Sequence, residues 1–537
     1  MIPAIGDKAA RAVAVIVAAG ILTLLLAGMV RHYDPVPFFD AWDGDVGFYL
    51  RLGQGDGSAW WGFHNEHRIV LTRLLFYADN AWAGGVGIVP LCANVVLAAA
   101  MAGVFMVCIG TLTRRWARCE RLPWMALVVG LGAFWSQAQN FTWAFQPQFF
   151  LACLLPLAAC HAIAQASASA HRLGWFTAAC GFGVLALGSM ANGVLALPMV
   201  AVLATCFGFE RRYIMVAALL AVMGLATARL GYPPGGSMPA FPWRHPVGLA
   251  EFVALYLGSP LGAMFEVSHA SLLIAALAGT SLVAAVLVAS ARAWRTRATE
   301  PMRLALVVFT AYVLASALAT AIGRFDLGPV SAMSGRYSTP VLAAWSAVTI
   351  ALLPAAAPGR AVAWLPASCL VALLPMQATS LHRDGASLHA RSLAALAIEL
   401  QVDDPTTLQS VYPRPADVLA TGQAASKARL GVFGRWPLDG LSATMGAHVP
   451  RDACLGRVMA MHGLPGTLLT RFSVAGDGAT AALPAAVVLA DSQGTIVGAA
   501  LRVPEGTTST VDYDGYLPGP STLAQGPANA CQPPTDR

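Results

Sequence analysis

Charged residues are scarce in this chain. They make up 11% of its 537 residues, whereas hydrophobic residues make up 57%, and an ordinary soluble domain carries about 25% charged residues. The sequence also contains no GxxxxGK[ST], GxGxxG, HExxH or CxxC motif. These absences argue against an ATP-driven pump, a cytosolic dinucleotide enzyme and a zincin metalloprotease. The formal net charge of +6 is spread over short basic clusters, which does not indicate a nucleic-acid partner.

Long apolar runs predict an α-helical polytopic membrane protein. A helix needs about 20 apolar residues to cross the hydrocarbon core, and the sequence offers about 11 runs that approach this length. The first run is long and lacks a convincing cleavage site, so we expect an uncleaved span rather than a signal peptide. The predicted spans cover residues 12–30, 86–110, 123–138, 148–166, 174–190, 192–209, 213–230, 270–291, 303–322, 340–357 and 361–379.

Basic clusters between these runs predict the orientation of the chain. Residues 114–121, 171–172, 210–212 and 292–303 are rich in arginine, and cytoplasmic loops carry an excess of Lys and Arg. With the N-terminus in the cytoplasm, every cluster falls on the cytoplasmic side. A transmembrane domain over residues 1–380 then has three extracytoplasmic loops, at residues 31–85, 231–269 and 323–338.

The second of these loops opens with a proline- and glycine-rich run, YPPGGSMPAFPWRHP, that cannot form a plain helix. It continues as an apolar run interrupted by Gly258, Pro260 and Gly262. We expect a re-entrant or interfacial segment here, with a twelfth span as the alternative.

The composition changes after about residue 380. Short alternating runs punctuated by Gly, Asp and Pro predict strands, and residues 388–402 predict a helix. We therefore expect a small β-rich or α+β extracytoplasmic domain over residues 381–537. Cys454 and Cys531 are its only cysteines, and in an oxidising compartment we expect them to form a disulfide. The strand-like runs are residues 467–476, 485–494, 495–504 and 509–519.

An acidic stretch follows the first predicted span, in the sequence FFDAWD (38–43). Asp40 and Asp43 are three residues apart, so on a helix both carboxylates would share one face. A carboxylate at a membrane face with aromatic neighbours can act as a general base. The alternative is that both are simply solvated or cap a short helix.

The sequence HNEHR (64–68) is the second polar concentration. It places two imidazoles, a carboxylate and a guanidinium within five residues: His64, Glu66, His67 and Arg68. With Asp40 and Asp43, the histidines could form an oxygen-and-nitrogen site for a divalent cation. Equally, the segment could contact a substrate without metal, or serve only the structure of the loop.

Further polar residues lie near the predicted outer membrane faces. Amides such as Gln146 and Gln148 alternate with aromatic residues, which suits sugar hydroxyls and equally an interfacial aromatic belt. Asn192 breaks two apolar runs at a predicted outer turn. Arg324 and Arg336 oppose the charge preference of outer loops, and a guanidinium fork matches phosphate oxygens. Arg336, beside Tyr337, is the better phosphate candidate; a salt bridge of either arginine to Asp326 is the alternative.

Together these features resemble a largely uncharacterised subgroup of bacterial GT-C glycosyltransferases. The resemblance covers residues 1–380 and is carried by FFDAWD, HNEHR, QPQ (146–148), ANG (191–193) and SGRY (334–337). In many members a contiguous Asp-Glu pair follows the first span, but this chain has no such pair there. The resemblance implies a GT-C-like fold in the bacterial inner membrane, a polyprenyl-phosphate sugar donor, a glycan or glycolipid acceptor, and a periplasmic C-terminal domain.

The implied reaction is inverting transfer of a hexosyl or pentosyl group. A carboxylate deprotonates the acceptor hydroxyl, which attacks the anomeric carbon, while arginine stabilises the leaving phosphate. Asp40 is the first choice for the base and Asp43 the second. No cofactor is certain; Mg²⁺ or Mn²⁺ on Asp40, Asp43, His64 and His67 is compatible with the reaction. Two rival hypotheses are a transporter or flippase for a lipid-linked saccharide and a non-catalytic subunit of an envelope-assembly machine.

Overall fold

The computed structural model describes residues 4–231, 244–357, 359–476, 484–504, 511–518 and 527–533. The chain divides into two compact units, each described here by itself. Unit 1 comprises Met1–Tyr33, Trp61–Thr72 and Pro90–His382; unit 2 comprises Asp34–Trp60, Arg73–Val89 and Arg383–Arg537. The predicted outer loop 31–85 is thereby divided between the two units. Most of the proline- and glycine-rich run of the second loop, residues 232–243, lies outside the described residues.

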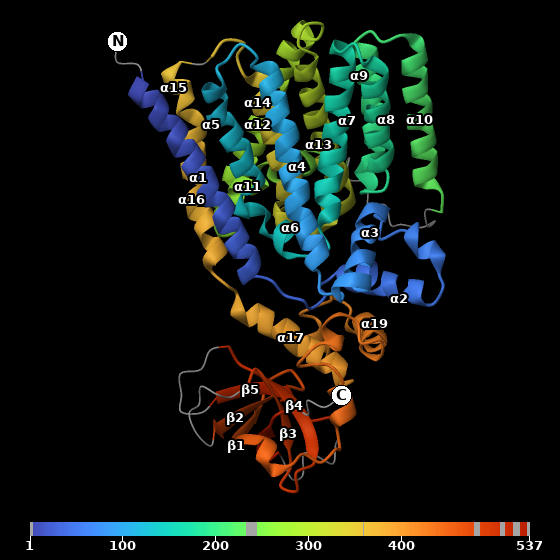
Figure 1. The fold of residues 1–537 in the computed structure, drawn as a ribbon, viewed down its shortest axis with the longest axis vertical. Coiled ribbons are helices and arrows are strands. Elements are labelled where there is room, and N and C mark those ends of the chain that lie inside the picture. Colours follow the sequence, from blue (N-terminus) through green and yellow to red (C-terminus); the bar gives the residue numbers. More distant parts are fainter. Residues whose placement is uncertain are drawn as a thin grey trace. The chain divides into compact units, whose positions relative to one another are not determined.

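Unit 1 is a bundle of helices (Figure 1). Six described helices are long and apolar enough to cross a membrane, which supports the prediction of a helical membrane protein. The count of about 11 spans is not confirmed. The six are α1 (Ala4–Arg31), α4 (Ile88–Leu112), α7 (Pro147–Ala168), α10 (Arg211–Arg229), α12 (His269–Thr296) and α13 (Pro301–Arg324).

The other five predicted spans are also helical, but they are short. A helix rises 1.5 Å per residue, so 15 residues reach only about 22 Å of a core that is roughly 30 Å thick. None of the five exceeds 15 residues: α5 (Arg118–Gly132), α8 (Arg172–Ala186), α9 (Ala196–Cys206), α14 (Ser338–Leu352) and α16 (Leu365–Ala378). Two very short helices, α6 (Ala138–Thr142) and α15 (Arg360–Ala363), complete this part of unit 1.

The apolar part of the second loop forms helix α11 (Pro246–Gly262), which packs against α12. The glycine that was expected to interrupt it serves the packing instead. A Cβ at Gly258 would collide with the carbonyl of Ala275 on α12, and a Cβ at Gly279 would collide with the carbonyl of Ala254 on α11. Small residues at such a crossing let two helix backbones approach closely.

Unit 2 contains a closed antiparallel barrel with the strand order β1-β2-β5-β4-β3-β6 (Figure 1). The predicted β-rich domain is therefore a small barrel, in which strand β6 closes the sheet against β1 and leaves no open edge. Cys454 of β1 lies opposite Cys531 of β6, and the two form a disulfide. The strands are β1 (Cys454–Gly463), β2 (Thr470–Gly476), β3 (Ala486–Ala490), β4 (Ile496–Arg502), β5 (Val511–Tyr516) and β6 (Asn529–Cys531).

Helices and irregular segments complete unit 2. Helix α17 (Gly385–Glu399) contacts strands β4 and β5, and it also packs on α18 (Pro405–Leu408) and α19 (Pro415–Lys427). Trp42 is fully buried in the same core, with its ring 6.5 Å from that of Phe433. Residues 34–60 add helix α2 (Phe48–Gly53), and α3 (Val70–Ala78) begins in unit 1 and continues into unit 2.

Candidate functional site

The HNEHR segment of unit 1 is a tight turn. His64 and His67 exchange two backbone hydrogen bonds of 2.9 Å. Asn65, at the corner, has a φ of 49°, a left-handed conformation that asparagine adopts more readily than most residues. The turn therefore holds the two histidines at the two ends of a fixed loop.

The imidazole of His67 is positioned from both sides. Its Nδ1 accepts a hydrogen bond of 3.3 Å from the amide of Ala191, and its Nε2 lies 3.4 Å from Oε1 of Glu66. In the neutral ring the proton therefore sits on Nε2, facing the carboxylate. The Glu66 side chain is 48% exposed, so this pair can meet a ligand from solvent.

The side chain of Arg68 contacts other parts of unit 1. Its side chain is buried, and its guanidinium donates to the carbonyl oxygens of Trp61 and Leu230. The same group lies over the Phe63 ring, 4.0 Å from its centroid. Arg68 thus links the loop to the end of helix α10, which favours the loop-structure alternative, and its expected substrate contact stays a prediction.

Aromatic rings and amides lie beside the first histidine. The buried His64 ring is 4.9 Å from the ring of Phe145, which precedes the expected amides Gln146 and Gln148. Both amides are at least 96% buried, and neither Oε1 atom accepts a hydrogen bond within the described residues. A buried acceptor without a donor costs about 1–3 kcal/mol. These two oxygens are therefore ready acceptors for ligand hydroxyls.

The SGRY loop before α14 is held by a buried network of amides. The backbone amide of Arg336 donates to Oε1 of Gln139 at 3.1 Å, and its carbonyl accepts from Nδ2 of Asn140 at 2.9 Å. Asn140 also donates to Thr339, whose hydroxyl donates to Gln137 at 2.6 Å. The amides of the 137–140 segment are thus engaged in fixing this loop.

The side chains of the SGRY loop are less engaged than its backbone. Among the described residues, neither Nε of Arg336 nor the hydroxyl of Tyr337 makes a hydrogen bond, although both atoms are buried. The Tyr337 ring stacks on Tyr256 of α11 at 4.6 Å between centroids. The backbone of the loop is fixed, while Nε of Arg336 and the hydroxyl of Tyr337 make no hydrogen bond within the described residues. This arrangement is expected of a preorganised binding group.

Asn192 and Arg324 complete the predicted set in unit 1. Asn192 donates to the hydroxyl of Ser316 on α13 at 3.1 Å, and its own oxygen has no hydrogen-bond donor in the described part of the chain. Arg324 is partly buried at the end of α13. No ion pair joins Arg324 or Arg336 to Asp326 within the described residues, so the salt-bridge alternative gains no support.

The structure therefore connects the predicted residues of unit 1 into two groups. One contains the histidine turn, Ala191 with the adjacent Asn192, and Phe145 with the adjacent Gln146. The other contains the SGRY loop on its amide network.

The predicted carboxylates belong to unit 2. Asp43 is exposed and accepts a hydrogen bond from the hydroxyl of Tyr412, to which Arg414 also donates at 3.2 Å. Burial, together with the bond to Asp43, raises the pKa of the Tyr412 hydroxyl. Asp40 is partly buried, and its carbonyl begins the helical segment by accepting from the amide of Gly44.

The sequence analysis missed a third carboxylate in the same stretch, Asp45. It accepts a hydrogen bond of 2.7 Å from the buried Asn80, and burial raises the pKa of Asp45 to about 8. Both residues lie in π-helical segments, Trp42–Gly47 and Asp79–Ala83, and such segments often mark functional sites. The signal available in the sequence was the third acidic residue of DGD (43–45), but burial is not visible there.

The residues expected to bind a metal come from both units, with Asp40 and Asp43 in unit 2 and His64 and His67 in unit 1. Across the described ranges, no group of three or more His, Cys, Asp or Glu residues is arranged to hold a metal ion. Asp40, Asp43, His64 and His67 therefore gain no support as ligands of Mg²⁺ or Mn²⁺.

No protein-family model, curated protein or solved structure matches this chain. Function is therefore inferred from the chemistry of the residues described above.

Proposed function

We propose that this chain is an inverting GT-C-type glycosyltransferase. It would move a sugar from a polyprenyl-phosphate donor to a hydroxyl of an envelope glycan or lipid, on the extracytoplasmic face of a bacterial inner membrane. The observation that carries the proposal is the SGRY loop, in which the backbone of Arg336 is fixed while its buried Nε has no acceptor among the described residues.

A phosphate group fits this arrangement better than a protein carboxylate does. A guanidinium presents a planar fork of donors that matches two phosphate oxygens, and the contact is stronger where water is partly excluded. Anchoring the backbone beforehand reduces the entropy lost on binding. The neighbouring Tyr337 hydroxyl can donate to a third oxygen of the same phosphate.

The proposed reaction forms one bond and breaks one. A carboxylate takes the proton of the acceptor hydroxyl, the hydroxyl oxygen bonds to the anomeric carbon, and the bond from that carbon to the phosphate oxygen breaks. Arg336 stabilises the negative charge that develops on the leaving polyprenyl phosphate. Because the leaving group is already stabilised, no general acid is needed.

Asp40 and Asp43 belong to unit 2, whereas the SGRY loop belongs to unit 1. The catalytic base is therefore assigned from the sequence argument. One oxygen of Asp43 accepts the Tyr412 hydroxyl, so Asp40 remains the first choice. In unit 1, we propose that Gln146, Gln148 and Asn192 accept sugar hydroxyls, and that the Glu66–His67 pair orders the substrate.

Full-length protein in nanodiscs, incubated with radiolabelled polyprenyl-phosphate hexoses and pentoses, tests the proposal. Arg336→Ala should reduce transfer by about 100-fold, as expected for loss of a transition-state charge contact, and Arg336→Lys should restore part of it. Asp40→Asn should abolish transfer. Arg295→Ala and Asp403→Asn, which alter exposed side chains, are matched controls and should leave transfer unchanged.

Full transfer activity in both Arg336→Ala and Asp40→Asn would refute this assignment. Movement of a lipid-linked saccharide across proteoliposomes, without transfer from any donor, would favour the transporter hypothesis instead.

A further inference from the structure

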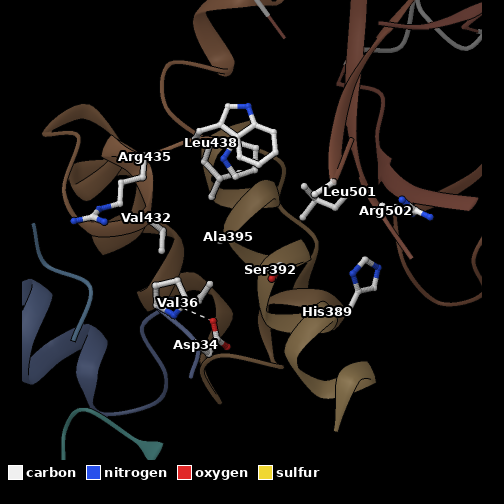
Figure 2. A pocket seen from close by; sticks show the side chains of 14 residues that line it. Asp34, Val36, His389, Ser392, Ala395, Val432, Arg435, Leu438, Leu501 and Arg502 are labelled. Atoms are coloured by element: carbon white, nitrogen blue, oxygen red, sulfur yellow. Dashed lines mark hydrogen bonds between the residues drawn. The ribbon is translucent and has the colours of Figure 1, made fainter. Parts of the chain in front are cut away.

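Unit 2 contains a cavity of about 330 Å³ that the proposed transfer reaction does not use. It is lined by the segment at Asp34, by helix α17, by the turn that contains Trp436, and by strand β4 with the residues before β3. Figure 2 shows these side chains around the opening, with Arg435 and Arg502 directed outward. The volume lies at the lower end of the range for small-molecule sites.

One end of the cavity carries an unsatisfied carboxyl oxygen. The Asp34 side chain is 7% exposed; its Oδ1 accepts from the amide of Val36 at 3.0 Å, and its Oδ2 has no hydrogen-bond donor within the described residues. Nη1 of Arg391 lies 3.6 Å from Oδ2, as an ion pair that is too long for a hydrogen bond. A buried carboxyl oxygen in this state is stabilised by any ligand that brings a donor to it.

Other parts of the lining are apolar and aromatic. Val36, Val432 and Leu501 line the cavity, and Trp436 lines it with a side chain that is 60% exposed. An exposed indole can stack its face on a flat or ring-shaped ligand. His389 adds a polar edge: its Nε2 faces Asp514 at 3.4 Å, which leaves Nδ1 as the atom that can meet a ligand.

Other ligand classes fit this lining less well. An acyl chain would leave the Asp34 oxygen buried without a donor, which is unfavourable. A cationic ligand would meet Arg391 beside the carboxyl and Arg435 and Arg502 at the rim. The lining calls for an apolar ligand face and for a hydrogen-bond donor, and a neutral sugar ring has both. Its C–H faces suit the indole and the aliphatic wall, and its hydroxyls can donate to the carboxyl.

We propose that this cavity is a saccharide-binding site, in which one sugar ring lies against Trp436 and one hydroxyl donates to Oδ2 of Asp34. The site belongs to unit 2 alone and does not depend on the transfer reaction. It would give the protein a way to hold a glycan whether or not the chain is a transferase.

Saturation-transfer NMR on the full-length protein in nanodiscs tests this, with methyl glycosides of glucose, galactose, mannose, N-acetylglucosamine and arabinose as probes. At least one glycoside should give a saturable signal. Trp436→Ala and Asp34→Asn should each weaken its binding by about tenfold, the effect of about 1.4 kcal/mol. Trp82→Ala, which removes an exposed tryptophan of unit 2 outside this cavity, is the matched control.

Binding at the cavity is separated from binding elsewhere by Arg336→Ala, which should leave this signal unchanged even if it abolishes transfer. If Trp436→Ala does not fold, as judged by its thermal unfolding midpoint, Asp34→Asn decides alone. The proposal is overturned if no glycoside gives a saturable signal, or if Trp82→Ala weakens binding as much as Trp436→Ala. It is also overturned if decanoate binds in a Trp436-dependent way without displacing the glycoside, because an acyl chain would then occupy the cavity and the glycoside would bind elsewhere.

Discussion

Asp45 should make the stability of unit 2 depend on pH between about 4 and 8. Burial, with a smaller contribution from the neighbouring Asp79, raises the pKa of its carboxyl from 3.8 to about 8, although the Asn80 hydrogen bond opposes the shift. Between these values the folded state keeps a proton that the unfolded state has released. Folding therefore becomes less favourable as pH rises through this window and stops changing above pH 8. Asp45→Asn, which keeps an uncharged group of similar shape, should remove the dependence.

The size of the effect follows from the same two values. The interval from 3.8 to about 8 is roughly four pH units, and each is worth about 1.4 kcal/mol, which gives an upper limit of about 6 kcal/mol. Asp45 is partly exposed, so screening by solvent reduces this to about 3 kcal/mol. For a unit of about 200 residues, that corresponds to a difference of roughly 6–12 °C in the unfolding midpoint.

The measurement is the difference in thermal midpoint between Asp45→Asn and the wild type, at one scan rate, at pH 5 and pH 9. Groups that titrate equally in both proteins cancel in this difference. Between pH 5 and pH 9 about three of these four units are crossed, so the variant should gain on the wild type by about 4–9 °C. Asp56→Asn is the control, because hydrogen bonds from Ser58 and Arg51 lower the pKa of this carboxyl and it stays charged in the window. An equal midpoint difference at pH 5 and pH 9 would refute the reasoning.

Three further predictions concern packing and covalent structure. Asn140→Ala removes one buried and one partly buried hydrogen bond that hold the loop before α14. It should lower stability by about 2–3 kcal/mol, seen as a lower thermal midpoint, and an unchanged midpoint would contradict the network. Gly258→Ala should loosen the α11–α12 crossing and lower the midpoint, whereas Gly323→Ala, where a Cβ meets open space, should not. Reducing the Cys454–Cys531 disulfide, which spans 77 residues, should destabilise the barrel by about 4 kcal/mol, measured as protease sensitivity with and without reductant; equal sensitivity would count against this estimate.

The helices of unit 1 could be predicted because their signal is local. Each predicted apolar run coincides with a helix, since continuous hydrophobicity without helix breakers favours one. The segment at 246–262 forms 17 helical residues although it contains Gly258 and Pro260, which usually disrupt helices. Its expected re-entrant or interfacial place, with a twelfth span as the alternative, stays a prediction. The sequence could not show that Gly258 meets a neighbouring backbone, because its contact lies on another helix.

The barrel was predicted in part. Strands β2 to β5 fall within the four alternating runs, but β1 and β6 were not expected. Strand β6 has three residues and no alternation of its own, and its place is decided by pairing with β1 and β3. The disulfide was expected only because two cysteines were left in that domain.

The candidate site shows the same division. The charged residues of FFDAWD, HNEHR and SGRY are visible in the sequence alone, because charged residues are scarce in this chain. Whether a polar group is available to a ligand depends on partners that are distant in the chain. Arg68 meets Leu230, and Asn140 meets Thr339, so tertiary structure gave both side chains partners that are distant in the chain. Within the described residues, Nε of Arg336 makes no hydrogen bond, and the same is true of Nε of Arg68 and Oδ1 of Asn140. Tertiary structure also decided the burial that raises the pKa of Asp45, because burial is a property of the folded surroundings and not of the residue.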